Sequence, residues 1–115
     1  MTSPTDELRT AAQSLMDLAD AAQEDLDTGD YWKPYDKATA WRDGFANGFG
    51  GVSSDLVAVF PPATAQALAT WLRKAAEHYD AGFTCCDDGP QHCDEITAPA
   101  LAVARQVNAA GGGAR

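Results

Sequence analysis

The stretch that decides the fold is Pro61–Asn108, which holds two segments of helical periodicity: PPATAQALATWLRKAAEHYD at residues 61–80 and TAPALAVARQVN at residues 97–108. In each segment the apolar residues recur at steps of three and four, so each forms one apolar stripe on a helix. The stripes are Ala65, Leu68, Ala69, Leu72, Ala75, Ala76 and Tyr79 in the first segment, and Ala100, Val103, Ala104 and Val107 in the second. Because a short loop joins them, the sequence predicts an antiparallel helix pair.

The N-terminal part predicts a third main helix near residues 4–27. Ser3 can cap it, and Pro4 fits its first turn, where the backbone N–H has no helical partner. Its predicted apolar stripe is Leu8, Ala11, Ala12, Leu15, Leu18, Ala19, Ala22 and Leu26. Together with helices near 62–81 and 97–109, this predicts an all-α fold, a small bundle of three main helices. The predicted core includes Leu15, Leu18, Leu68, Leu72, Val103 and Val107.

The middle of the chain is rich in aromatic residues. Residues 28–54 hold Tyr31, Trp32, Tyr35, Trp41, Phe45 and Phe49. The four-residue spacing of the last three predicts a short aromatic helix from about Asp36 to Asn47. The rings either cap the core of the bundle or form a partly exposed patch for a partner. We interpret the following run, DLVAVF at Asp55–Phe60, as one turn of buried helix, since no other segment would pair with it as a strand.

Composition limits the classes of function. The 115 residues fit one domain, predicted at 1–110 with a disordered tail at 111–115. A formal net charge of −9 should repel nucleic acid and anionic membranes, and it favours a protein partner with a basic surface. The start, MTSPTDELR, lacks the features of a signal peptide, and the apolar runs are too short to span a bilayer. We therefore expect a cytoplasmic protein; the sequence does not predict an oligomeric state.

Four carboxylates of the first predicted helix define an acidic ridge: Asp17, Asp20, Glu24 and Asp27. Their spacing of three, four and three places them on a face different from the apolar stripe. The ridge is either a solvated helix face or a docking surface for a basic partner.

All three cysteines lie in the loop before the last predicted helix, within CCDDGPQHCDE at residues 85–95. With the two histidines they give five candidate zinc ligands within sixteen residues: His78, Cys85, Cys86, His92 and Cys93. Zinc prefers four nitrogen or sulfur ligands, so the loop predicts one structural zinc ion that would join the two flanking helices. The alternatives are a disulfide from Cys93 to Cys85 or Cys86, and free thiols.

The chain offers little for catalysis. A pair such as Cys86 with His78 could form a thiol nucleophile and its base, but no third orienting group or oxyanion hole is evident. The prediction is that the protein is not an enzyme. The alternatives are a metal- or thiol-dependent enzyme and an orphan structural helical domain.

Several motifs resemble small proteins of unknown function from phages of actinobacteria, and more loosely the ead-type proteins of other phages. LRTAAQ at 8–13 followed by Thr28 and Trp32 is similar to their LREAAE helix and Thr-Pro-Gly-Pro-Trp turn, although both prolines are missing here. DLVAVFPPATAQALATWL at 55–72 and ALAVARQ at 100–106 resemble their later helices. The resemblance implies a phage or prophage accessory protein that acts in the host cytoplasm by binding a host protein. It brings no known activity and no catalytic residues.

Overall fold

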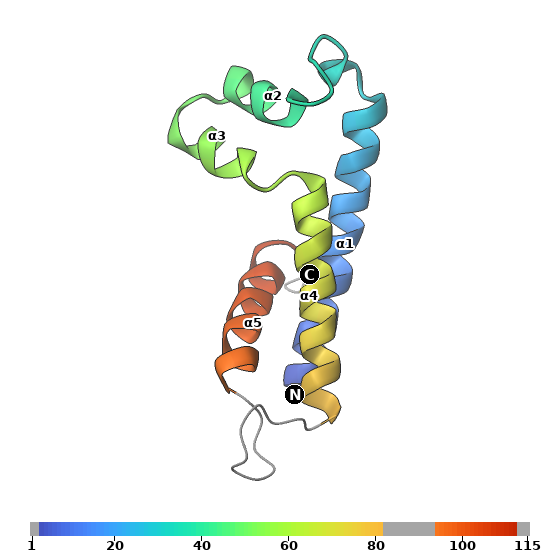
Figure 1. The fold of residues 1–115 in the computed structure, drawn as a ribbon, viewed down its shortest axis with the longest axis vertical. Helices are drawn as coiled ribbons and strands as arrows, with labels where there is room; N and C mark the ends of the chain where they lie inside the picture. The colour runs from blue at the N-terminus through green and yellow to red at the C-terminus, as the bar shows by residue number, and fades with distance from the viewer. Residues whose placement is uncertain (1–2, 82–93, 113–115) are drawn as a thin grey trace. The chain divides into compact units, whose positions relative to one another are not determined.

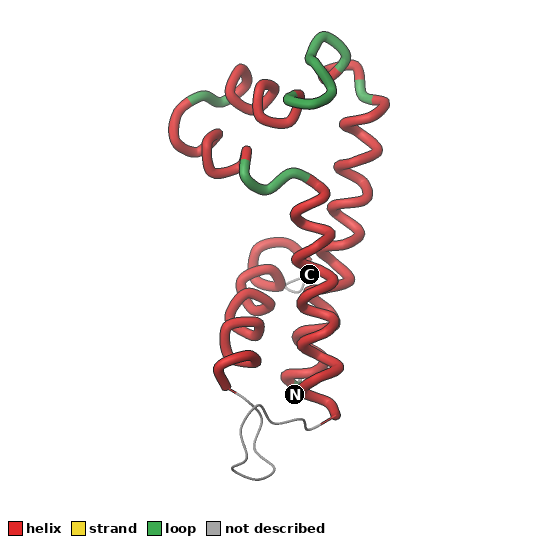
Figure 2. The backbone as a smooth tube through the Cα atoms, in the orientation of Figure 1, coloured by secondary structure: helices red, strands yellow, loops and turns green. Residues whose placement is uncertain are grey.

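The structure, a computed structural model, describes residues 3–81 and 94–112. These residues are all-α, as predicted, with five α-helices and no strand among them (Figure 1; Figure 2). The helices are α1 (Pro4–Thr28), α2 (Ala40–Gly48), α3 (Gly51–Ala58), α4 (Pro62–Ala81) and α5 (Asp94–Val107). A 3-10 turn, η1 (Asp30–Trp32), follows α1, and a π-helical turn, η2 (Asn108–Gly112), follows α5.

The chain forms two compact units. Unit 1 combines α1 up to Met16 with α4 from Ala67 onward and with α5. Unit 2 is Asp17–Gln66, which includes η1, α2 and α3.

Unit 1 has a core made mostly of alanine. Its buried residues come from all three helical segments: Leu8, Ala11 and Ala12 of α1, Leu72, Ala75 and Ala76 of α4, and Ala100 and Ala104 of α5. Leu8 and Leu72 are its large side chains that are fully buried. Figure 1 shows α5 running back beside α4 in the opposite direction. Because alanine keeps helix axes close together, the core gains contacts but little apolar area.

Polar contacts fix the end of α5 against the start of α1. The Arg105 guanidinium binds both carboxylate oxygens of Glu7, from Nε at 3.3 Å and from Nη2 at 3.2 Å. One turn further on, Asn108 Nδ2 donates to the Glu7 carbonyl oxygen at 3.1 Å. A two-point contact of this kind sets direction as well as distance. It therefore fixes how α5 lies along α1.

The predicted core is right in part. Leu72 is fully buried, whereas Leu15, Val103 and Val107 are partly buried at the edge of the core. Leu68 is half-buried. The prediction for Leu18 is wrong, because its side chain is 59% exposed. Leu18 lies in the part of α1 that belongs to unit 2, where the neighbouring Ala19 is buried instead.

The aromatic helix begins later than predicted, at Ala40 rather than near Asp36. Asp36 forms a turn instead: its Oδ1 accepts from the Ala38 N–H at 2.9 Å, and its carbonyl accepts from the Thr39 N–H at 3.0 Å. An aspartate that bonds to backbone two residues ahead favours a turn over a helix. The helix then ends at Gly48.

Two glycines turn the chain from α2 into α3. Gly50 and Gly51 have φ of 72° and 71°, a region that only glycine enters without strain. The indole of Trp41 on α2 holds α3 against it, because Trp41 Nε1 donates to the Val57 carbonyl at 2.9 Å. The prediction of a helical turn in the run DLVAVF is thus right, but the helix starts earlier, at Gly51.

Candidate functional site

The aromatic side chains of unit 2 form a continuous series of ring contacts. Tyr31 meets Trp32 edge-on at 5.1 Å, and Trp32 stacks on Trp41 at 5.8 Å. The series continues from Trp41 to Phe45 at 4.7 Å and from Phe45 to Phe49 at 6.0 Å. Contacts of this geometry add to the burial of the rings. They hold η1 against α2.

Two hydrogen bonds orient this series. The Tyr31 hydroxyl donates to the Gly44 carbonyl at 2.6 Å, and Trp32 Nε1 donates to Asp25 Oδ2 at 2.8 Å. The ring of Trp32 lies directly over Gly44, where a Cβ atom would come within 2.3 Å of it. The middle of the series is half-buried, but Tyr31 and Phe49 are exposed. Of the two interpretations of the aromatics, the partly exposed patch describes this geometry better.

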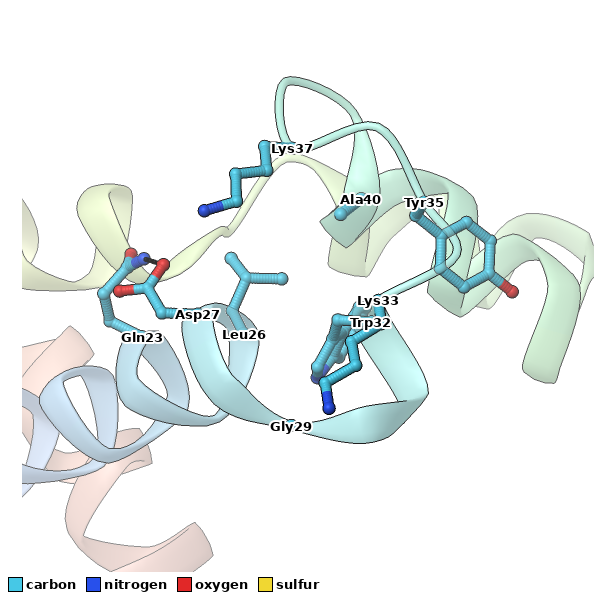
Figure 3. A pocket seen from close by; sticks show the side chains of 9 residues that line it. All are labelled: Gln23, Leu26, Asp27, Gly29, Trp32, Lys33, Tyr35, Lys37 and Ala40. Atoms are coloured by element: carbon cyan, nitrogen blue, oxygen red, sulfur yellow. Dashed lines mark hydrogen bonds between the residues drawn. The ribbon is translucent and has the colours of Figure 1, made fainter.

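A pocket of about 200 Å³ lies where α1 ends and α2 begins (Figure 3). Its wall includes Trp32, Tyr35 and Leu26 together with groups of both charges, Asp27, Lys33 and Lys37. Lys33 Nζ is paired with Asp30 Oδ1 at 2.6 Å, and Asp27 Oδ1 accepts from Gln23 Nε2 at 3.0 Å. The pocket therefore has an aromatic wall and charged groups, some of which already pair with neighbouring residues. Its lining residues do not include a nucleophile beside a base.

The acidic ridge lies entirely in unit 2. All four carboxylate residues, Asp17, Asp20, Glu24 and Asp27, are exposed, as the sequence predicts. Asp20 accepts a hydrogen bond from Gln66 Nε2 at 2.8 Å, and Asp27 accepts one from Gln23. Both donors are neutral amides, so neither of these hydrogen bonds pairs the carboxylate with a basic side chain. A role of the ridge in binding stays a prediction.

Helix α3 has an exposed apolar stripe on one side. Val52, Leu56 and Val59 follow one another at steps of four and three, so they share one side of the helix. With the phenylalanines at either end they form what we call the α3 surface: Phe49 (80% exposed), Val52 (82%), Leu56 (64%), Val59 (61%) and Phe60 (48%). The prediction that this run is buried is wrong.

The side of α3 that faces α2 carries a buried serine. Ser54 is 3% exposed, and its hydroxyl lies within hydrogen-bonding distance of the carbonyl oxygens of Phe45 at 2.9 Å and Gly50 at 3.1 Å. These carbonyls satisfy the serine, so a polar residue can take the inner position at little cost. Ser54 therefore takes the inner position, with Val57 and Ala58 half-buried, while Val52 and Leu56 are exposed together with Ser53 and Asp55.

A groove adjoins the α3 surface. It has a volume of about 260 Å³ and is lined by Phe45, Phe49, Ser53, Ser54 and Val57. Because the Ser54 hydroxyl is engaged with backbone carbonyls, aromatic and aliphatic groups dominate the wall. Phe49 belongs to both features, so the groove meets the α3 surface at Phe49. The α3 residues of the groove lie about 100–200° around the helix axis from Val52, on a different side of α3 from the exposed stripe.

The start of α2 contains a carboxylate whose pKa is shifted. The Thr39 hydroxyl donates to Asp43 Oδ2 at 2.7 Å and the Arg42 guanidinium donates to its Oδ1 at 3.1 Å. The hydroxyl first, and the guanidinium second, lower the pKa of Asp43 below its ordinary value of 3.8. A lowered pKa means that the carboxylate stabilises the fold above pH 3.8 and that this contribution is lost as the pH falls through the lower folded value.

Removing the hydroxyl with Thr39→Val is expected to raise the pKa of Asp43 toward 3.8, because it removes the main cause of the shift. Arg42→Gln should raise it less. An NMR titration of the Asp43 side-chain carboxyl carbon measures both changes. A pKa that stays the same in Thr39→Val would contradict the assignment.

Of the five predicted zinc ligands only His78 lies among the described residues, where it is half-buried in the last turns of α4. The other four, Cys85, Cys86, His92 and Cys93, lie outside the described residues. Within residues 3–81 and 94–112 no three potential metal ligands come together. The zinc site, the disulfide and the free thiols all stay predictions.

The α3 surface was not among the sites predicted from the sequence. Its signal was the spacing of Val52, Leu56 and Val59, which places them on one side of a helix, although Val57 and Ala58 put apolar residues on the other side as well. An apolar stripe alone does not indicate whether it faces the core or the solvent. The burial of Ser54 shows which side of α3 faces inward. That burial depends on the packing of α3 against α2, which the sequence alone does not give.

Comparison of the chain with protein-family models, with curated proteins and with solved structures finds no match. Among the described helices none is both long and apolar enough to cross a membrane.

Proposed function

We propose that this chain is a non-enzymatic protein-binding module and that the α3 surface is where its partner docks. The observation that carries the proposal is the exposure of Val52, Leu56 and Val59 on one side of α3, opposite the buried Ser54. An exposed patch of contiguous apolar side chains on a soluble domain commonly marks a site of protein interaction.

The energetics favour a site that also uses charge. Full burial of a valine, leucine or phenylalanine side chain is worth about 1.5–3 kcal/mol, and these side chains are already partly covered. Association itself costs roughly 4–15 kcal/mol in lost freedom and ordering. The α3 surface alone therefore supports weak binding. The acidic ridge on the same unit supplies a second, electrostatic contribution toward a basic partner.

The resemblance to phage accessory proteins suggests that the partner is a host protein in the host cytoplasm. The net charge of −9 favours a basic partner surface and disfavours nucleic acid. A structural zinc ion in the cysteine loop is compatible with this function. The alternative function, a metal- or thiol-dependent enzyme, depends on that same loop.

We expect the triple variant Val52→Ser, Leu56→Ser, Val59→Ser, called the α3 variant below, to lose at least ten-fold in capture of a discrete protein from an actinobacterial lysate. Serine keeps the stripe exposed but removes its apolar area. The matched control is Leu18→Ser, which removes from the same unit a leucine that is 59% exposed, close to the 64% of Leu56. Capture is measured by quantitative mass spectrometry of the bound fraction.

The ridge is tested in the same assay with Asp17→Asn, Asp20→Asn, Glu24→Gln and Asp27→Asn combined. We expect weaker capture and a smaller dependence on salt, because screening acts on exposed charges.

Undiminished capture by the α3 variant would contradict the proposed docking surface.

A further inference from the structure

We infer that the partner segment on the α3 surface is an amphipathic helix whose apolar side is flanked by lysine or arginine. This inference rests on the proposed function and deepens it. It follows from three features of unit 2: the shape of the exposed stripe, the adjoining groove and the charge around both.

The shape of the surface suits a helix. Val52 to Val59 spans about 10 Å along the axis of α3, and Phe49 and Phe60 extend the patch at either end. A single straight stripe of this kind packs against the stripe of another helix. An added strand is a poor alternative, because it needs an exposed sheet edge and the described residues of unit 2 form helices and turns alone.

The groove supplies an anchoring point. Its volume of 260 Å³ and its lining by Phe45, Phe49 and Val57 suit an apolar side chain that enters beside Phe49. Interfaces commonly draw much of their affinity from one such buried anchor. Helix-in-groove recognition combines an anchor of this kind with a stripe at steps of three and four.

The charge identifies the flanks of the partner helix. Asp55 is the one charged residue in Gly51–Ala58, and it lies about 60° around the helix axis from Val52, at the edge of the stripe. Unit 2 as a whole has nine carboxylate side chains against three lysine or arginine side chains. A basic flank complements these charges, whereas a second copy of the chain would bring like charges together.

The probe for the test is a 14-residue peptide of leucine and lysine with its leucines at helical spacing. A permuted peptide of the same composition, with its leucines scattered around the helix, is the matched control. Binding to the full chain is measured by fluorescence anisotropy of a labelled peptide. We expect the periodic peptide to bind at least ten-fold more tightly than the permuted one, and the α3 variant to lose that preference. Asp55→Asn should weaken binding a few-fold, and Leu18→Ser should leave it unchanged.

Three results would overturn the inference. Equal binding of the two peptides would mean that charge alone is recognised. If the combined variant Asp17→Asn, Asp20→Asn, Glu24→Gln, Asp27→Asn then lost that binding, the chain would still be a protein-binding module, but its site would be the acidic ridge. If the α3 variant still preferred the periodic peptide over the permuted one, the site that binds the helix would lie elsewhere on the chain. Sedimentation as a dimer that the α3 variant abolishes would make a second copy the occupant. Circular dichroism of each variant confirms that its helices are retained.

Discussion

Leu72→Ala is expected to lower the free energy of unfolding by about 2–5 kcal/mol, the cost of removing most of a fully buried leucine side chain. The alanines of α1, α4 and α5 around it lie on closely packed helices and have short side chains. They have little capacity to fill the space that the change leaves. A loss toward the upper end of that range is a large share of the stability of a small domain.

Leu18→Ala is the matched control for Leu72→Ala. The sequence predicts both leucines in the core, but Leu18 is 59% exposed. Its replacement should therefore change stability by no more than about 0.5 kcal/mol. Urea unfolding followed by circular dichroism measures both variants. Equal losses in the two would contradict the burial pattern of α1 and α4.

Gly44→Val is expected to destabilise unit 2 by about 1–3 kcal/mol, because the new Cβ would lie 2.3 Å from Trp32 Cζ3. The ring cannot move away without losing its stack on Trp41 and its hydrogen bond to Asp25. Valine is a better helix former than glycine by only a few tenths of a kcal/mol, so the clash decides the sign.

Gly48→Val makes the same change one turn later on α2. There the new Cβ would meet only the Tyr31 hydroxyl, at 3.2 Å, which a small shift relieves. We expect a near-neutral effect on stability and unchanged tryptophan fluorescence. In Gly44→Val the fluorescence should change as Trp32 is displaced. Similar effects of the two valines would show that the ring does not pack on Gly44.

The long helices were predictable because each carries its own periodicity and its own end signals. α4 runs from Pro62 to Ala81, within the predicted bounds, and α1 ends at Thr28, one residue beyond the prediction. The burial of α1 was less predictable, because its neighbours change along its length. A single stripe from Leu8 to Leu26 assumes one partner, whereas the helix contributes first to unit 1 and then to unit 2. Leu18 lies about 80° around the helix axis from Leu8, at the edge of the stripe, and it is exposed, whereas Ala19 nearer the centre of the stripe is buried.

The candidate site was predictable only in its acidic part. Exposed carboxylates on a helix follow from spacing alone, and the ridge is exposed as predicted. The α3 surface depends on tertiary contacts: the turn at Gly50 and Gly51, and the satisfaction of Ser54 by two carbonyls. A hydrophobicity pattern does not predict which side is exposed, because α3 also has apolar residues, Val57 and Ala58, on its half-buried side.

The docking surface is tested most directly by NMR mapping of backbone amides during titration of the labelled full chain with the periodic leucine–lysine peptide. We predict that the largest shift changes fall within residues 49–60, on the α3 surface and its groove, and that the permuted peptide leaves them small. Changes confined to residues 17–27, or to the helices of unit 1, would contradict a docking site on α3.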